Sequence, residues 1–353
     1  MNLITETISR IEPIENVWLE RAAARQLELT KPPGSLGRLE EIANRLCAIQ
    51  RTLQPSVMRR EIFVFAASHG VCAEGVSPYP AAVTAQMVLN FLGGGAAINA
   101  LAKSANADLT VIDIGVDGDF TEIAPNFVKA KIAPGTKNFA EVAAMSEMEM
   151  RRAIEIGIET ARAAKKNNAA IIGLGEMGIG NTTSASAITA SLLGIAPEDC
   201  VGRGTGARDA MLAHKIEIVN RALTVNQPNG GDAFDVLQKV GGFEIAGLVG
   251  LCLGAAAERL AIVTDGFIAT AAVALAIKIC PFVHEYIFAS HLSVECGHHA
   301  LLEFIGQKPL FDLEMRLGEG TGAALAMNIV GAAVAAFNEM ANFETAGISG
   351  KSS

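Results

Sequence analysis

Aromatic residues, basic runs and paired cysteines are all scarce in this chain of 353 residues. Aromatic side chains make up only 5% of it, while glycine (35 residues) and alanine are abundant, which favours helices packed closely on a sheet over an aromatic-rich β-sandwich. The formal net charge of -9 and the lack of a basic run exclude wholesale binding to a nucleic-acid backbone. A single phosphate group is still compatible, because backbone amides and one or two cations can hold it.

Other absences exclude further classes. The six cysteines form no C-x-x-C pair, so neither a disulfide framework nor a structural zinc site is expected. The N-terminus lacks the basic start and the apolar stretch of a signal peptide. Charged residues such as Glu258 and Asp265 interrupt the most apolar segments before they could span a bilayer. We therefore expect a cytoplasmic protein without a membrane span.

Short apolar runs alternate with helical patterns along the chain. Strands are predicted at residues 62–67, 109–114, 169–173, 260–264 and 286–289. Helical patterns cover 13–29, 36–49 and 185–193, and further helices begin near Ser146 and Thr321. This alternation predicts an α/β fold with a mainly parallel sheet, helices on both faces and a ligand beyond the carboxyl ends of the strands.

The chain length and the position of the helices also predict two lobes. The large α/β domain is expected over residues 60–305. A smaller, mostly helical lobe is expected to combine residues 1–59 with residues 306–353. These boundaries are approximate, because no linker is obvious in the sequence.

The densest chemical signal is the glycine-rich stretch 173–184, between a predicted strand and a predicted helix. Its glycines allow a ligand to approach the backbone closely, and the start of the helix supplies unpaired N–H groups. Asn181, Thr182 and Thr183 add side-chain donors. The stretch therefore predicts a phosphate site, with a plain strand-to-helix turn as the alternative.

The same stretch supports a rival function. Gly173, Gly175 and Gly178 satisfy the G-x-G-x-x-G fingerprint of dinucleotide-binding proteins, which indicates an NAD-dependent oxidoreductase as the alternative. Against it, Glu176 would place a carboxylate beside the pyrophosphate. The fingerprint also leaves the residues 181–183 unexplained.

Two later glycine clusters, at residues 202–206 and 318–322, have the same sequence except at their second position. The first offers the cation Arg203 and the second the carboxylate Glu319, which small neighbours leave open to a ligand. The following helix would stabilise the charge of Glu319, whereas burial would destabilise it. A catalytic role and simple loop chemistry are both compatible with Glu319 on this pattern alone.

The histidines do not indicate a metal. Cys296, His298 and His299 cluster in the sequence but lack the spacing of a known metal motif, so no metal ligand is expected. His69 follows a predicted strand and either contacts a ligand or is a hydrogen-bonded polar residue of the loop. Neither a G-x-S-x-G elbow nor a P-loop is present.

Four motifs together resemble the nicotinate-nucleotide:dimethylbenzimidazole phosphoribosyltransferase family. They are the residues 31–37 (KPPGSLG), His69-Gly70, Glu176 to Thr183 and Gly318 to Gly322. The resemblance extends over nearly the whole chain and implies a homodimer with a Rossmann-like α/β fold and a small second domain. It implies transfer of a phosphoribosyl group from nicotinate mononucleotide to 5,6-dimethylbenzimidazole, in the assembly of the lower ligand of cobalamin. The products are α-ribazole 5'-phosphate, inverted at C1 of the ribose, and nicotinate, and no cofactor is needed.

The resemblance also assigns residues. Glu319 is the implied general base, and Glu176 lies beside the reacting centre. The implied phosphoribosyl contacts are Gly178, Gly180, Asn181, Thr182, Thr183, Gly202, Lys215 and Asp265. The implied base pocket contains Pro78, Gln86 and Met177. One position departs from the family, because Ser68 stands where an aspartate is usual.

Overall fold

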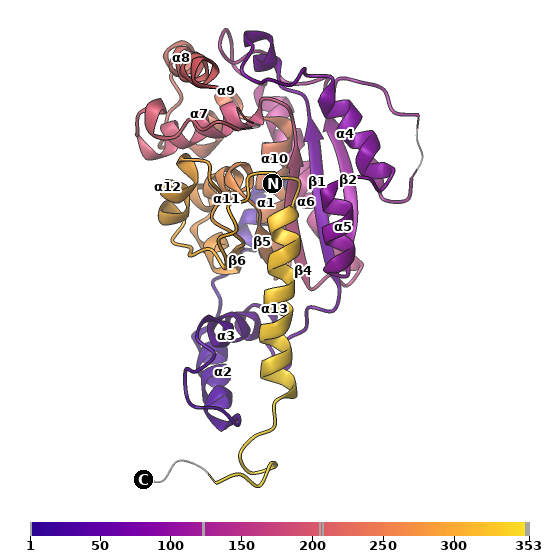
Figure 1. Ribbon diagram of the computed structural model, residues 1–353, viewed down its shortest axis with the longest axis vertical. Coiled ribbons are helices and arrows are strands. Elements are labelled where there is room, and N and C mark those ends of the chain that lie inside the picture. The colour runs from indigo at the N-terminus through magenta and orange to yellow at the C-terminus, as the bar shows by residue number, and fades with distance from the viewer. Residues whose placement is uncertain (1, 122–123, 205, 207, 350–353) are drawn as a thin grey trace.

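The protein is built on a six-stranded parallel sheet (Figure 1). The computed structural model describes residues 2–121, 124–204, 206 and 208–349. The strand order is β3-β2-β1-β4-β5-β6. The strands are β1 (Arg60–Ala67), β2 (Ala107–Gly115), β3 (Phe127–Lys129), β4 (Ile171–Met177), β5 (Ala261–Thr264) and β6 (Ile287–Ala289).

The five predicted strands are confirmed, and β3 was missed. β1, β4, β5 and β6 are buried almost throughout, which is why they appear in the sequence as continuous apolar runs. β3 has only three residues at the edge of the sheet, and two of them are exposed. A strand this short shows no periodic pattern, so only its pairing with β2 identifies it.

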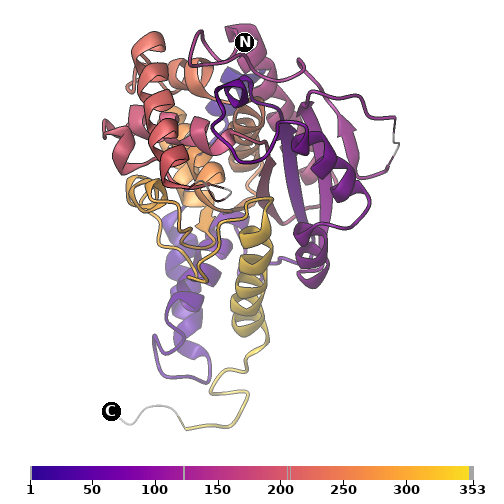
Figure 2. The ribbon, with the colours of Figure 1, turned by 45° about the horizontal axis from the view of Figure 1, so that its top comes forward.

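Helices cover both faces of the sheet, as predicted (Figures 1 and 2). α10 and α11 pack on one face, with α6 behind α10, while α4, α5 and α13 pack on the other. The helices are α1 (Leu3–Ser9), α2 (Asn16–Glu28), α3 (Arg38–Gln50), α4 (Val83–Leu92), α5 (Ala97–Ser104), α6 (Glu147–Lys166), α7 (Asn181–Leu193), α8 (Asp209–Asn226), α9 (Ala233–Val240), α10 (Phe243–Ala257), α11 (Phe267–Ile279), α12 (Gly297–Phe304) and α13 (Thr321–Glu339).

The glycine-rich composition allows the helices to pack closely. Apart from Glu244, α10 is apolar around its circumference, and it is buried between the sheet and α6. A Cβ atom on Gly157 of α6 would lie 2.5 Å from the backbone nitrogen of Leu251 in α10. Such a contact between two helix backbones is possible only at glycine.

Terminal elements join in a narrow extension below the sheet, formed by α2, α3 and the C-terminal part of α13 (Figures 1 and 2). Two backbone hydrogen bonds close it, from Phe343 N to Glu28 O and from Thr30 N to Ala341 O. The first helix, α1, lies instead against α6 and α10. The lobe boundaries at residues 60 and 305 stay a prediction.

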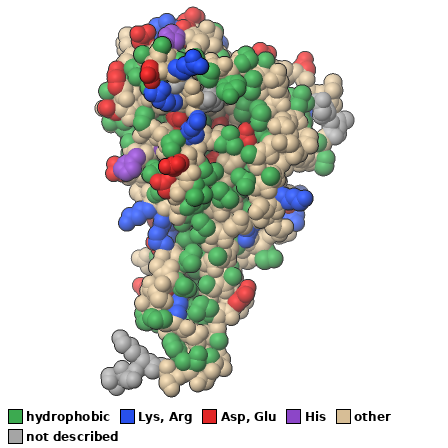
Figure 3. All heavy atoms as spheres, viewed as in Figure 1, with side chains coloured by type: hydrophobic (Ala, Val, Ile, Leu, Met, Phe, Trp, Pro, Cys, Tyr) green, Lys and Arg blue, Asp and Glu red, His purple; other side chains and the backbone are tan. Residues whose placement is uncertain are grey.

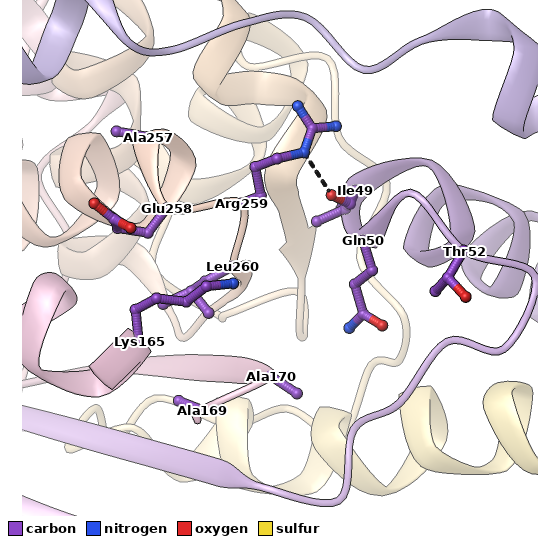
Figure 4. A pocket seen from close by; sticks show the side chains of 10 residues that line it. All are labelled: Ile49, Gln50, Thr52, Lys165, Ala169, Ala170, Ala257, Glu258, Arg259 and Leu260. Carbon is purple, nitrogen blue, oxygen red and sulfur yellow. Dashed lines mark hydrogen bonds between the residues drawn. The ribbon is translucent and has the colours of Figure 1, made fainter. Parts of the chain in front are cut away.

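A hollow of about 510 Å³ opens at the amino ends of the strands, where α3, α6 and α10 end (Figure 4). Arg259 crosses it and donates from Nε to the Ile49 carbonyl at 2.9 Å and from Nη2 to the Ala48 carbonyl at 3.0 Å. These bonds satisfy two carbonyl acceptors in the last turn of α3 and link α3 to the end of α10. Parallel sheets bind ligands at the opposite edge, so this hollow is not our candidate active site.

Two described segments have the length and apolarity of a membrane span, Val83–Ser104 and α13. The turn at residues 93–95 divides the first into α4 and α5. The second lies against β4 and β5 and is more than half buried in the protein. A segment divided by a turn and a helix that is mostly buried against a sheet are both typical of a globular fold.

Candidate active site

A cavity of about 610 Å³ lies beyond the carboxyl ends of β4, β5 and β6. The strand order reverses direction between β1 and β4, and such switch points are where open α/β sheets bind ligands. The cavity is lined by residues from segments 76–87, 176–182, 203–204, 266–268, 291–295 and 316–319 and by Lys215. It therefore joins the three glycine-rich clusters that the sequence singled out.

Glu319 is positioned by a tight turn before α13. Gly318, Glu319 and Gly320 all have left-handed backbone angles, with φ of 86°, 63° and 83°. The turn packs on β4, since a Cβ atom on Gly175 would lie 2.9 Å from the Glu319 carbonyl oxygen. The Glu319 side chain lines the cavity and is 6% exposed, and its Oε2 has no hydrogen-bond partner among the described residues.

Burial decides the direction in which the pKa of Glu319 moves. Burial first, and then the charge of Asp265, raise the pKa of Glu319 from 4.5 to about 7. The N–H of Ile98, at the start of α5, lowers this pKa by a smaller amount. A carboxylate with a pKa near the working pH suits a general base, because its basic form is populated and accepts a proton readily.

Glu176, the second predicted catalytic carboxylate, lies near the end of β4 and is 4% exposed. Burial, followed by the charges of Asp265 and Glu244, raises its pKa to about 8. Asn181 donates a hydrogen bond from Nδ2 to Glu176 Oε2, which lowers the pKa less than these causes raise it. At neutral pH the Glu176 carboxyl is therefore mostly protonated, whereas Glu319 is partly ionised.

We expect Glu176→Gln to stabilise the fold at alkaline pH. Between pH 4.5 and about 8 the folded chain holds a proton on Glu176 that the unfolded chain has lost, so this residue lowers stability as the pH rises. The variant should gain on the order of 2 kcal/mol in unfolding free energy at pH 8.5 and much less at pH 5. Urea unfolding at both pH values measures this, with the exposed Glu303→Gln as control. An equal gain at both pH values would contradict the raised pKa.

A cationic group lies at another part of the cavity wall. Lys215 of α8 is 1% exposed and donates from Nζ to the Gly202 carbonyl at 3.0 Å and to Thr182 Oγ1 at 3.1 Å. Burial lowers its pKa. Its two hydrogen bonds go to neutral oxygens and the charge of Glu295 opposes the lowering of its pKa, so an anion in the cavity would be a further partner for this ammonium.

The phosphoribosyl residues implied by the sequence divide into two groups. Gly178, Gly180, Asn181, Thr182 and Lys215 line the cavity. Three others do not line it, namely Thr183, Gly202 and Asp265. Asn181 begins α7, so N–H groups at the start of that helix border the cavity.

The predicted base pocket is partly placed at the cavity. Met177 lines it, whereas Pro78 and Gln86 do not, although their sequence neighbours Tyr79 and Met87 do. Pro78 and Gln86 are exposed on the segment that leads into α4 and on α4 itself. A base-pocket role for these two residues stays a prediction.

Several cavity residues were missed by sequence reasoning. Ser293 and Glu295 follow β6, and Arg316 precedes the Glu319 turn and donates from Nη1 to the Gly204 carbonyl at 3.1 Å. Glu295 is buried, and its Oε2 has no hydrogen-bond partner among the described residues. The one sequence signal for Ser293 and Glu295 was their position shortly after a predicted strand. Arg316 has no signal beyond its nearness to the glycine cluster.

His69 and Ser68 make structural contacts and do not line the cavity. His69 Nε2 lies 2.7 Å from Glu244 Oε1, and both side chains are fully buried away from the cavity lining. Ser68 Oγ accepts a hydrogen bond from the Asp117 backbone N–H at 3.0 Å. An aspartate oxygen could accept the same bond, so the departure at position 68 changes a loop contact outside the cavity lining.

His298 and His299 do not converge on a common site. His298 Nδ1 accepts from Ser293 N–H and its Nε2 contacts Thr270 Oγ1, while His299 is exposed. Burial, followed by His291 and His299, lowers the pKa of His298 to about 3. Among the residues that the structure describes, no three His, Cys, Asp or Glu side chains group as metal ligands.

Comparisons with known proteins agree on one family. A family model described as phosphoribosyltransferase matches residues 11–348. The nicotinate-nucleotide:dimethylbenzimidazole phosphoribosyltransferase of Geobacter metallireducens is 53% identical over 348 residues, which cover 99% of this chain and 98% of the relative.

Solved structures agree with this match. The crystal structure of CobT from Thermus thermophilus is 46% identical and superimposes with a TM-score of 0.91, covering 95% of this chain and 100% of that one. A crystal structure of the nicotinate-nucleotide-dimethylbenzimidazole phosphoribosyltransferase from the same organism gives 45% identity and a TM-score of 0.90, covering 96% and 100%.

Proposed function

Because this chain belongs to the nicotinate-nucleotide:dimethylbenzimidazole phosphoribosyltransferase family, we propose that Glu319 is the general base of the transfer and that Lys215 holds the phosphate. The protein transfers a phosphoribosyl group from nicotinate mononucleotide to 5,6-dimethylbenzimidazole, in the assembly of the lower ligand of cobalamin. The products are α-ribazole 5'-phosphate and nicotinate. The comparisons support this transfer and not the alternative of an NAD-dependent oxidoreductase.

The chemistry requires alignment and one proton acceptor. Nicotinate mononucleotide carries a cationic pyridinium on C1 of its ribose, so the bond to the leaving group is already polarised. An azole nitrogen attacks C1 from the opposite face, and the electron pair of the broken bond leaves with nicotinate. Attack on that face inverts β to α. The proton on the other azole nitrogen must then go to a base.

The observation that carries the assignment of Glu319 is its place among the cavity residues, with one carboxylate oxygen that has no hydrogen-bond partner among the described residues. Oε2 has no hydrogen-bond partner among the described residues, although the side chain is almost wholly buried. In this proposal the side chain turns this unused acceptor towards the bound azole, from which it accepts the proton. The carboxylate also offsets positive charge that develops on the base and on the ribose during attack.

Glu176 has a different role in this proposal. With its pKa raised to about 8, it lies at the cavity wall mostly as a neutral acid at pH 7. A neutral carboxyl group can donate a hydrogen bond, for example to a ribose hydroxyl, as well as accept one. We assign it to orienting the sugar beside the reacting carbon.

The phosphate is assigned to the end of the cavity with Lys215. The ammonium of Lys215, the hydroxyl of Thr182 and the positive end of the α7 dipole together suit a small anion. Gly178 and Gly180 leave room for it beside the backbone. Thr183 and Gly202 would act on this group through neighbouring residues, since they do not line the cavity.

The quaternary state and the location are further parts of the proposal. The family resemblance implies a homodimer in the cytoplasm. The apolar residues Val17 and Leu27 on α2 are 49% and 61% exposed. Figure 3 shows apolar side chains along the extension. A second copy of the chain could cover such a surface. Sedimentation analysis of the purified chain would test this, and a monomer at all concentrations would contradict it.

One assay tests the proposed function. The purified protein is incubated with nicotinate mononucleotide and 5,6-dimethylbenzimidazole, and the products are separated and identified by mass. Nicotinate and α-ribazole 5'-phosphate should form in equal amounts. Omitting the azole should abolish nicotinate release if transfer, rather than hydrolysis, is the reaction. No product from the complete mixture would refute the proposal.

A further inference from the structure

The turn that carries Glu319 is strained. A left-handed conformation costs a residue with a side chain roughly 1–2 kcal/mol, and Glu319 adopts it between two glycines that do the same. Strained backbone of this kind persists only where surrounding contacts determine it, and it is concentrated at functional sites. The contacts that hold this turn therefore decide where the Glu319 carboxylate points.

Asp265, which follows β5, supplies these contacts. Its Oδ2 accepts a hydrogen bond from the Gly320 N–H, and its Oδ1 accepts one from the Gly322 N–H, both at 2.8 Å. The carboxylate thus satisfies two backbone donors at the start of α13 from a distant part of the chain. A Cβ atom on Gly322 would lie 2.7 Å from Asp265 Oδ1, so a side chain at position 322 would disturb this contact.

Asp265 is not placed to touch the substrate. Its side chain is 1% exposed and does not line the cavity, and both of its oxygens are occupied by the turn. The backbone of Asp265 is fixed as well, because Ser290 Oγ donates to its carbonyl at 3.1 Å. A direct phosphoribosyl contact, as the sequence motif implied, would require the carboxylate to leave the turn.

We infer that Asp265 is a positioning residue, whose carboxylate holds the left-handed turn at Gly318–Gly320 so that Glu319 faces the cavity. The inference rests on the proposed role of Glu319 as the general base. It assigns to Asp265 an effect on turnover rather than on substrate affinity. Removing the carboxylate should release the turn and misplace the base.

Other titratable groups face this carboxylate. His291, after β6, places Nδ1 3.9 Å from Asp265 Oδ1, and the charge of Asp265 acts on both Glu176 and Glu319. The charge of Glu244 on α10 also raises the pKa of Glu176, and the charge of Asp312 raises that of His291 against the effect of burial. Burial raises the pKa of Asp265, and His291 opposes this rise. The negative charge of Asp265 raises the pKa of Glu319, so removing that charge should lower it.

Asp265→Asn tests the inference through kcat, KM and pH dependence. An asparagine presents one oxygen and one NH2 group to two N–H donors, so it can hold only one of them. We expect kcat to fall about 10- to 100-fold, as a misplaced catalytic group predicts, with KM for nicotinate mononucleotide nearly unchanged. The acid limb of the kcat/KM profile should move to lower pH. A large rise in KM with kcat unchanged, or an unmoved limb, would overturn the inference.

Two parallel variants make the result specific. Asp113→Asn changes another buried aspartate, on β2 and separated from β5 by β1 and β4, whose Oδ1 accepts from the Val116 N–H, and should leave kcat and the pH profile unaltered. Glu319→Gln is assayed beside it. If Glu319→Gln keeps full activity, the assignment of the base fails, which is distinguishable from a failure confined to Asp265.

Hydrogen exchange on the unaltered protein gives a second test, which does not require a variant to fold. The amide hydrogens of Gly320 and Gly322 donate to a fully buried carboxylate and should exchange slowly. Exchange as fast as that of an exposed loop amide such as Glu314 would overturn the inference, because the turn would then not be held.

Discussion

Glu319→Gln should lower kcat by about 10²- to 10⁴-fold, the range that a general base typically contributes. The substitution keeps the shape of the side chain but removes its ability to accept a proton. The pyridinium leaves without protonation, so the step that slows is the attack of the azole and the loss of its proton. Single-turnover measurements of nicotinate release would show the loss directly.

The binding of nicotinate mononucleotide to this variant should be preserved, because the phosphate end of the cavity is unaltered. Glu314→Gln is the matched control, since Glu314 lies in the same loop, is exposed, also has a positive φ of 56° and does not line the cavity. It should retain full activity. Equal activity of Glu319→Gln and Glu314→Gln would remove Glu319 from the mechanism.

Lys215→Met should raise KM for nicotinate mononucleotide about 10- to 100-fold. A hydrogen bond to a charged group contributes roughly 1.5–3 kcal/mol, and the methionine side chain fills a similar volume without a donor. The variant also leaves the buried Glu295 carboxyl without the nearby cation, so its unfolding free energy is measured beside the kinetics. Steady-state kinetics with varied nicotinate mononucleotide measures the change.

The substrate itself provides the control for Lys215. Nicotinate riboside lacks the phosphate, so Lys215→Met should alter its transfer far less than that of nicotinate mononucleotide. Lys278→Met, at an exposed position of α11, should leave both reactions unaltered. A similar loss with both substrates from Lys215→Met would show that the lysine acts on the ribose or on the fold rather than on the phosphate.

Much of the fold follows from the sequence, because its sheet is parallel and covered on both faces. Such strands are continuous apolar runs, and the polar residues directly after them mark the edge where ligands bind. Asp265 follows β5 and His291 follows β6 at this edge of the sheet, where His291 lines the cavity and Asp265 lies behind it. The helix after Ser146 also begins as the capping box predicts, with Glu149 accepting the Ser146 N–H.

The parts that were not predictable depend on distant contacts. Whether burial or a helix start decides the pKa of Glu319 cannot be found from neighbours in the chain, because Asp265 and Ile98 lie far from it in sequence. Neighbours in the chain also cannot show which of the phosphoribosyl residues line the cavity and which lie behind it. Gly202 matches the motif but acts through its carbonyl on Lys215.

The pH dependence of kcat/KM tests the central claim most directly, since it reports the base in the free enzyme. The activity of the unaltered protein should rise with pH through about 7, where Glu319 loses its proton, and then level off. Glu319→Gln should show low activity without this rise. A rise centred near pH 7 that persists in Glu319→Gln would mean that another group takes the proton from the azole.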